Sequence, residues 1–196
     1  SQRDFDLRIP VEFTKRGFFI AAIDYQGHGQ SGGDISNFNE KTDVPALAQD
    51  CSRLLDEIEK LPLYSEEVNP AHVGLIGHSL GGMVVLMNGA LDDRFHASVA
   101  WAPLVDPEGS GYPLGENFEP YVPVNLLKES QPQDLFIIAH EEDDIVPYGA
   151  NALKAHQITG CELMTLSDPL IGGGHNLLSN DVLGASINWF EDLFFP

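Results

Sequence analysis

The sequence predicts an α/β protein in which helices cover both faces of a mostly parallel sheet, giving a three-layer sandwich. Short apolar runs alternate along the chain with longer amphipathic segments, which is the pattern of parallel strands connected by helices. The chain has 196 residues, of which 43% are hydrophobic, and a chain of this length can bury a core without disulfides or metals. No internal repeat or long linker divides it, so we predict a single domain over residues 1–196.

The individual elements follow in order from the spacing of the apolar residues. Strands are expected where apolar runs are short and end in turn residues, and helices where apolar residues recur at helical spacing. The predicted strands are residues 17–24, 71–77, 96–101, 134–139 and 161–166. The predicted helices are residues 43–60, with Thr42 or Asp43 as the N-cap, and residues 80–91, 147–158 and 180–195.

The segment of residues 102–133 breaks this alternation. It contains six prolines and several glycines, so we predict that it is mostly irregular. Long loops inside compact domains often form lids or binding surfaces. We therefore predict a short proline-rich, lid-like loop over these residues.

Charge and cysteine content exclude several functions. The chain has 30 acidic and 10 basic residues, a net charge of −20, which repels nucleic acid and anionic lipid surfaces. Its two cysteines cannot form a disulfide framework, and no Cys/His spacing is typical of a zinc site. No apolar run approaches the roughly 18 residues of a membrane-spanning helix. We expect neither a nucleic-acid partner, nor a membrane segment, nor a metal.

A serine lies in a Gly-x-Ser-x-Gly pattern, residues 77–81, between a predicted strand and a predicted helix. A serine in this tight turn has a strained backbone, and the residues two positions away must be small to avoid the helix and the adjoining strand. The N–H of Leu80 is expected at the helix N-terminus, where partial positive charge stabilises an oxyanion. We therefore predict Ser79 as a nucleophile and Leu80 as an oxyanion donor.

A serine nucleophile needs a base, and the base needs a carboxylate that orients it. A run of carboxylates, residues 141–144, follows the predicted strand 134–139, and parallel strands all end at the edge where Ser79 is expected. His175 lies in a glycine-rich turn between the last predicted strand and the last predicted helix. The order along the chain is thus serine, acid, histidine.

Four motifs resemble those of the α/β-hydrolase-fold serine hydrolases. Besides the serine pattern, residues 24–32 (DYQGHGQSG) are similar to the family's Asp-x-x-Gly-His-Gly-x-Ser loop. Residues 143–147 (DDIVP) resemble its Asp-x-x-Val-Pro acid loop, and residues 174–176 (GHN) resemble its catalytic histidine loop. Because the motifs occur in the family's order, the chain resembles an esterase or lipase of this family from about residue 3 to its C-terminus.

The resemblance implies the α/β-hydrolase fold and a triad of Ser79, His175 and Asp143, because the acid-loop match selects Asp143 over Asp144. It implies no metal and no organic cofactor. One departure is His140, which stands where the family usually has glycine and either crowds the acid turn or adds a polar contact.

The implied function is hydrolysis of carboxylic esters or thioesters of small to medium acyl groups, through an acyl-enzyme. A serine at position 79, rather than an aspartate, disfavours the dehalogenase and epoxide-hydrolase branches of the fold. The alternatives are a peptidase of the same fold and a non-catalytic binding module that retains the fold.

Two further patterns have competing interpretations. Gly27, Gly29 and Gly32 match the spacing of a dinucleotide-binding loop, but that motif must open into a helix, and the residues that follow are typical of a loop. His28 and His78 flank the expected pocket, where we favour structural roles over direct catalysis.

The resemblance also implies that the N-terminal strands of the fold are missing. The predicted strands 17–24 and 71–77 resemble the family's fourth and fifth, between which the family places its third. A gap in the centre of a sheet would leave buried backbone groups unpaired. We expect an N-terminal segment or a second chain to complete the sheet and to supply a second oxyanion donor. The alternative is a strand over residues 7–12, although Pro10 argues against a central position for it.

Overall fold

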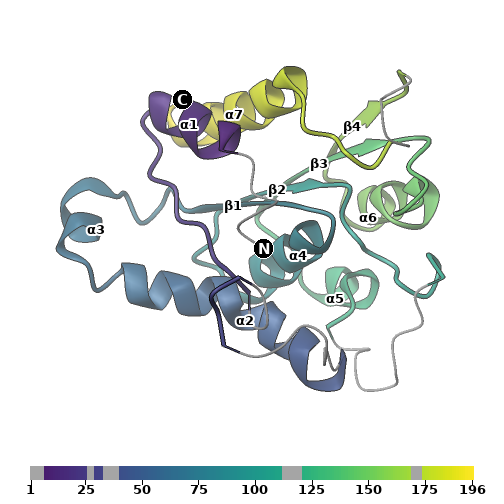
Figure 1. The fold of residues 1–196 in the computed structure, drawn as a ribbon, viewed down its shortest axis with the longest axis horizontal. Helices are drawn as coiled ribbons and strands as arrows, with labels where there is room; N and C mark the ends of the chain where they lie inside the picture. The colour runs from purple at the N-terminus through teal and green to yellow at the C-terminus, as the bar shows by residue number, and fades with distance from the viewer. Residues whose placement is uncertain (1–6, 26–28, 33–39, 112–120, 169–173) are drawn as a thin grey trace. The chain divides into compact units, whose positions relative to one another are not determined.

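The computed structural model describes residues 7–25, 29–32, 40–111, 121–168 and 174–196. The chain forms two compact units, Ser1–Asn69 and Pro70–Pro196. Figure 1 shows the course of the chain through its helices and strands.

The first unit opens with helix α1 (Arg8–Lys15). Pro10 lies in its first turn, where the missing N–H breaks no helical hydrogen bond. Phe13 is buried on the helix and meets the ring of Phe18 edge to face, with ring centroids 5.4 Å apart. The alternative of a strand over residues 7–12 is therefore wrong.

The predicted strand over residues 17–24 is not formed. Gly17 leaves α1 with a φ of 88°, and the chain that follows it, as far as Tyr25, has no regular structure. No strand occurs among the described residues of this first unit. A strand exists only where a neighbour accepts and donates its backbone hydrogen bonds, so an apolar run alone is insufficient.

Helix α2 (Glu40–Ile58) starts three residues earlier than predicted, so Thr42 and Asp43 lie inside the helix and do not cap it. Its buried side chains include Leu47 and Leu55. A short helix that was not predicted, α3 (Pro62–Glu67), follows and has proline in its first turn.

The second unit contains a four-stranded parallel sheet with strand order β1-β2-β3-β4. Its strands are β1 (Gly74–His78), β2 (Ala97–Trp101), β3 (Asp134–His140) and β4 (Glu162–Leu166). These confirm four of the predicted strands to within a few residues. All of β2 and nearly all of β3 are buried, as expected for strands covered on both faces.

Helices cover both faces of this sheet (Figure 1). Helices α4 (Leu80–Leu91) and α6 (Ala152–Thr159) contact the strands on one face, whereas α7 (Asn180–Phe194) lies across β2 and β3 on the other. The indole N–H of Trp101 on β2 donates to the hydroxyl of Ser186 on α7, 2.9 Å away. The second unit is therefore the predicted three-layer α/β arrangement.

Helix α5 (Pro123–Glu129) lies inside the segment 102–133, which was predicted to be mostly irregular. Its buried residues include Val124 and Leu127, and it packs against α4 and α6. Residues 112–120 are outside the described residues, so the lid-like role of the segment stays a prediction. In the part of the chain that the structure describes, no helix has both the length and the apolar content needed to cross a bilayer.

Candidate active site

Ser79 occupies the sharp turn between β1 and α4. Its φ of 58° and ψ of −116° lie in a region that residues with a side chain rarely adopt, so the backbone is strained at this position. Its N–H donates to the carbonyl of Trp101 on the adjacent strand, 2.9 Å away, and its carbonyl accepts the N–H of Met83. These backbone bonds hold the strained residue at the carboxyl edge of the sheet.

Glycines around the turn make room for this backbone. A Cβ atom on Gly77 would overlap the carbonyl of Gly81, and one on Gly82 would lie 2.9 Å from Cα of Pro103. Both clashes are with backbone atoms, which can move only at a large energetic cost. Small residues are therefore required at positions 77 and 82, of which the sequence pattern predicted the first.

The structure brings the three predicted triad side chains together. Nε2 of His175 is 3.0 Å from Oγ of Ser79, and Nδ1 of His175 is 2.9 Å from Oδ2 of Asp143. A carboxylate only accepts, so Nδ1–H donates to Asp143 and Nε2 is left to accept the serine hydroxyl. The side chains of His175 and Asp143 are 13% and 1% exposed. This orientation allows the imidazole to take a proton from the serine.

Asp143 is held by its own loop. Its Oδ1 accepts the N–H groups of Ile145 and Val146, at 2.9 and 2.8 Å. Charge-assisted bonds of this kind stabilise the ionised carboxylate and fix its direction. Asp144 is exposed, and Asp143 is the carboxylate that contacts His175.

Leu80 is the first residue of α4. N–H groups in the first turn of a helix have no carbonyl partner within the helix and carry the positive end of its dipole. The N–H of Leu80, directly after the serine, is thus in the position expected of an oxyanion donor.

Comparison with known proteins places the chain in a family. Residues 3–137 match the sequence profile of the "Alpha/beta hydrolase family". The chain belongs to this family. No curated protein sequence gives a significant match to this alpha/beta hydrolase.

Solved structures with the same fold include esterases and a peptidase, all of low identity. Acetyl xylan esterase 1 from Thermoanaerobacterium sp. JW/SL YS485 is 18% identical over 97% of this alpha/beta hydrolase and 71% of its own chain, with a TM-score of 0.72. An esterase from Pyrococcus furiosus is 19% identical over 95% and 73%, with a TM-score of 0.65. Dipeptidyl peptidase 4 from Porphyromonas gingivalis is 18% identical over 76% of this chain, with a TM-score of 0.60. This chain spans only 23% of that peptidase.

A buried asparagine, which was not predicted from the sequence, is hydrogen bonded to the end of the acid loop at Pro147. Asn151 is 1% exposed, and its Oδ1 accepts the N–H groups of Val105 and Asp106, at 2.7 and 3.0 Å. Its Nδ2 donates to the hydroxyl of Ser110 and to the carbonyl of Pro147, both 2.8 Å away. The side chain thus links the loop after β2 to the end of the acid loop.

His78 contacts the histidine of the triad through the backbone. Its Nε2–H donates to the carbonyl of His175, 2.7 Å away, and the centroids of the two imidazole rings are 4.8 Å apart. The partner is a backbone atom, and the structural role favoured from the sequence stays a prediction. Loss of hydration is the main cause that lowers the pKa of His78 below its ordinary 6.5. The hydrogen bond to the His175 carbonyl opposes this shift, and repulsion from the His175 ring lowers the pKa further.

The lowered pKa of His78 predicts a pH dependence of stability. The unfolded chain binds a proton at this residue more readily than the folded chain, so the free energy of unfolding falls as pH drops below about 6.5. In His78→Gln, a donor is kept but nothing titrates, and we expect a smaller loss of stability between pH 8 and pH 5. Urea unfolding at the two pH values measures this difference. Equal losses in the two proteins would contradict the prediction.

Residues 29–31 contact Asp24 in the first unit. The N–H of Gln30 donates to Oδ2 of Asp24, 3.0 Å away, and the hydroxyl of Ser31 donates to the Asp24 carbonyl. A Cβ atom on Gly29, which has a φ of 53°, would overlap the Asp24 carboxylate. His28, Gly27 and residues 33–39 lie outside the described residues, so the interpretation of His28 and of the dinucleotide-like spacing stays a prediction.

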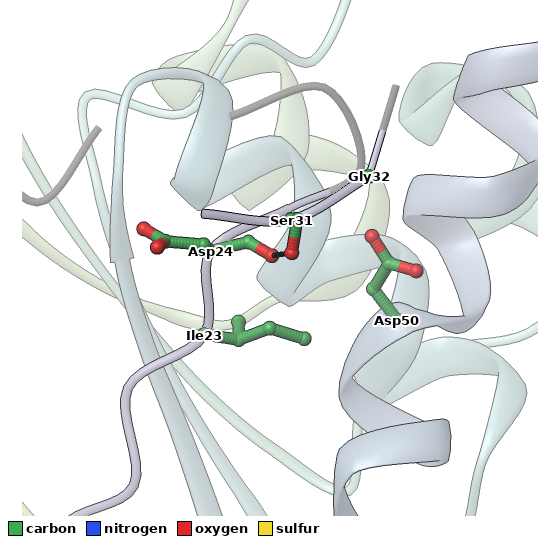
Figure 2. A pocket seen from close by; sticks show the side chains of 5 residues that line it. All are labelled: Ile23, Asp24, Ser31, Gly32 and Asp50. Carbon is green, nitrogen blue, oxygen red and sulfur yellow. Dashed lines mark hydrogen bonds between the residues drawn. The ribbon is translucent and has the colours of Figure 1, made fainter. Parts of the chain in front are cut away.

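A hollow of about 340 Å³ lies beside Asp24, and Asp50 of α2 faces this hollow (Figure 2). Its lining residues are Ile23, Asp24, Ser31, Gly32 and Asp50. Burial, and then the Asp50 carboxylate, raise the pKa of the neighbouring Cys51 thiol to about 12. The thiol stays protonated near neutral pH and is a poor nucleophile. Within the described ranges, no group of three or more His, Cys, Asp or Glu side chains is placed to hold a metal ion.

Proposed function

We propose that the protein is a serine hydrolase that cleaves carboxylic esters or thioesters of small to medium acyl groups. The observation that carries the proposal is the continuous hydrogen-bonded chain from Ser79 through His175 to Asp143. The esterases that share the fold support the choice of ester chemistry.

In the proposed acylation step, Oγ of Ser79 attacks the carbonyl carbon of the substrate while Nε2 of His175 takes its proton. The Asp143 carboxylate, nearly inaccessible to water, stabilises the imidazolium that forms. The developing oxyanion is stabilised by the N–H of Leu80 at the start of α4. The C–O bond of the ester then breaks, and the alcohol leaves with the proton from His175.

Deacylation repeats these steps with water as the nucleophile. His175 takes a proton from water, the resulting hydroxide attacks the acyl carbon, and the acid leaves as Ser79 recovers its proton. The side chains of the triad and one water molecule account for every proton moved.

A peptidase is the second candidate, because a dipeptidyl peptidase shares the fold. An amide needs the same attack but has a poorer leaving group, which His175 must protonate before the C–N bond breaks. The substrate screen separates the two activities.

The test combines a substrate screen with covalent labelling of the full-length gene product. We expect turnover of p-nitrophenyl acetate and butyrate and of a short acyl thioester, and slower turnover of peptide p-nitroanilides. A fluorophosphonate should add once, on the peptide that contains Ser79. Faster cleavage of the anilides would favour the peptidase. If the protein is neither labelled nor able to turn over any of these substrates, the proposal is overturned and a non-catalytic binding module is favoured.

A further inference from the structure

His140 is a buried imidazole that the proposed mechanism does not use. It is the last residue of β3, at the start of the acid loop, and it is 1% exposed. Buried polar groups of this size must be fully hydrogen bonded to be tolerated, so the partners of its two ring nitrogens define its role.

Both ring nitrogens of His140 have backbone partners. The N–H of Glu142 donates to Nδ1, 3.0 Å away, so Nδ1 carries no proton. The proton is therefore on Nε2, which donates to the carbonyl of Asp168, 2.6 Å away. One bond is to the residue directly before Asp143, and the other reaches the chain that follows β4. A single neutral imidazole thus joins the two segments.

The same imidazole packs against the residue that precedes His175. A Cβ atom on Gly174, which has a φ of 77°, would lie 2.8 Å from Nδ1 of His140 and 3.0 Å from the backbone nitrogen of Asp143. The Asp143 N–H in turn donates to the carbonyl of His140, 3.2 Å away. His140 therefore touches both the turn that carries the acid and the turn that carries the base.

We infer that His140 is a positioning residue that sets the separation of Asp143 and His175. The inference rests on the proposed function, because it assigns His140 a role in the reaction that these two residues carry out. Without the imidazole, the N–H of Glu142 and the carbonyl of Asp168 lose their partners, and the two turns lose the group that spans them. The hydrogen bond between the acid and the base then loosens.

Three substitutions separate positioning from simple filling of space. Asn at position 140 can place Oδ1 where Nδ1 now accepts, and Gln can place Nε2 where the ring now donates, so each keeps one of the two bonds. Leu fills a similar volume and makes neither. A misplacement of about 1 Å typically costs about 100-fold in rate. We expect His140→Leu to lower kcat by roughly 10–100-fold with little change in KM, and the Asn and Gln variants to recover part of the loss.

His156 supplies a matched control. His156 lies on α6 and takes no part in the contacts among Ser79, His175 and Asp143. Like His140, it bonds a backbone carbonyl, because its Nδ1 donates to the carbonyl of Cys161, 2.7 Å away. We expect His156→Leu to change the melting temperature without changing kcat. If His140→Leu keeps the kcat of the wild type, or if the Asn and Gln variants are no better than Leu at matched stability, the inference is wrong.

A readout that needs no turnover keeps the inference distinct from the proposed function. The Nδ1 proton of His175 bonded to a carboxylate gives a low-field proton NMR signal, which Asp143→Asn should remove and so identify. We expect this signal to be lost or shifted in His140→Leu and retained in the Asn or Gln variant. An unchanged signal in His140→Leu overturns the inference even if the wild type hydrolyses no ester. If the wild type shows no turnover but the NMR signal changes in His140→Leu, the proposed function is overturned and the inference about His140 stands.

Discussion

Replacing Ser79 with alanine is expected to lower kcat/KM for a p-nitrophenyl ester by roughly 10⁴–10⁶-fold, because the substitution removes the nucleophile. The activity that remains would come from substrate binding and from the oxyanion donor at Leu80 acting on water. The fold should survive, since alanine keeps the backbone bonds from residue 79 to Trp101 and Met83. Steady-state kinetics and circular dichroism on the same preparation check both statements.

Ser179→Ala is the matched control for that variant. The Ser179 hydroxyl accepts the N–H of Val182 and caps α7. Its loss should cost about 1 kcal/mol of stability and leave the rate unchanged. If Ser79→Ala hydrolyses the ester as fast as the wild type, the nucleophile is another group and the proposed function is wrong.

Replacing Asp143 with asparagine is the second large effect, a fall in kcat of about 10⁴-fold. The amide can still accept the N–H groups of Ile145 and Val146 through its oxygen, so the loop should keep its shape. Its NH₂ group then faces Nδ1 of His175, which must give up its proton to accept. The imidazole proton moves to Nε2, where it opposes deprotonation of the serine.

Asp144→Asn removes the same charge one residue away. Asp144 is exposed, so this variant reports only the general effect of a less acidic loop. We expect its kcat within about twofold of the wild type, since surface charges are strongly screened by solvent and salt. Comparable losses in the two variants would show that Asp143 acts through its charge alone and not through its bond to His175.

The sheet of the second unit was predictable because each of its strands is a short run of mainly apolar residues that ends in turn residues. Apolar residues dominate the runs 96–101 and 134–139, as expected for strands buried on both faces. Helix α4 was predicted at its observed bounds, since the glycine-rich turn at Ser79 fixes its start. The run 17–24 has the same composition but forms no strand, because pairing depends on a neighbour that composition does not specify.

Two helices that were not predicted begin at a proline. Pro62 begins α3 and Pro123 begins α5, both in segments where a helix was not predicted. Proline stops a helix when it lies inside it but starts one readily in the first turn. Apolar residues such as Val124 and Leu127, buried behind the second proline, were the signal for α5.

The contacts that join Ser79, His175 and Asp143 were predictable, whereas Asn151 and the partners of His140 were not. Ser79, Asp143 and His175 lie in short motifs whose spacing is set by local turns. Asn151 bonds the N–H of Val105, and His140 bonds the carbonyl of Asp168. Both partners are backbone atoms far away in sequence, and backbone atoms leave no mark on composition. Only the folded structure identifies such partners.

The positive φ of Ser79 means that stability and the proposed reactivity make opposite demands on the residue at this position. Glycine adopts this backbone freely, whereas a residue in a sparsely populated region of φ and ψ costs on the order of 1–3 kcal/mol. Laboratory evolution for heat tolerance alone would therefore drive position 79 toward glycine and, under the proposed mechanism, yield a more stable but inactive protein. Selection for turnover would have to be maintained throughout to keep the serine.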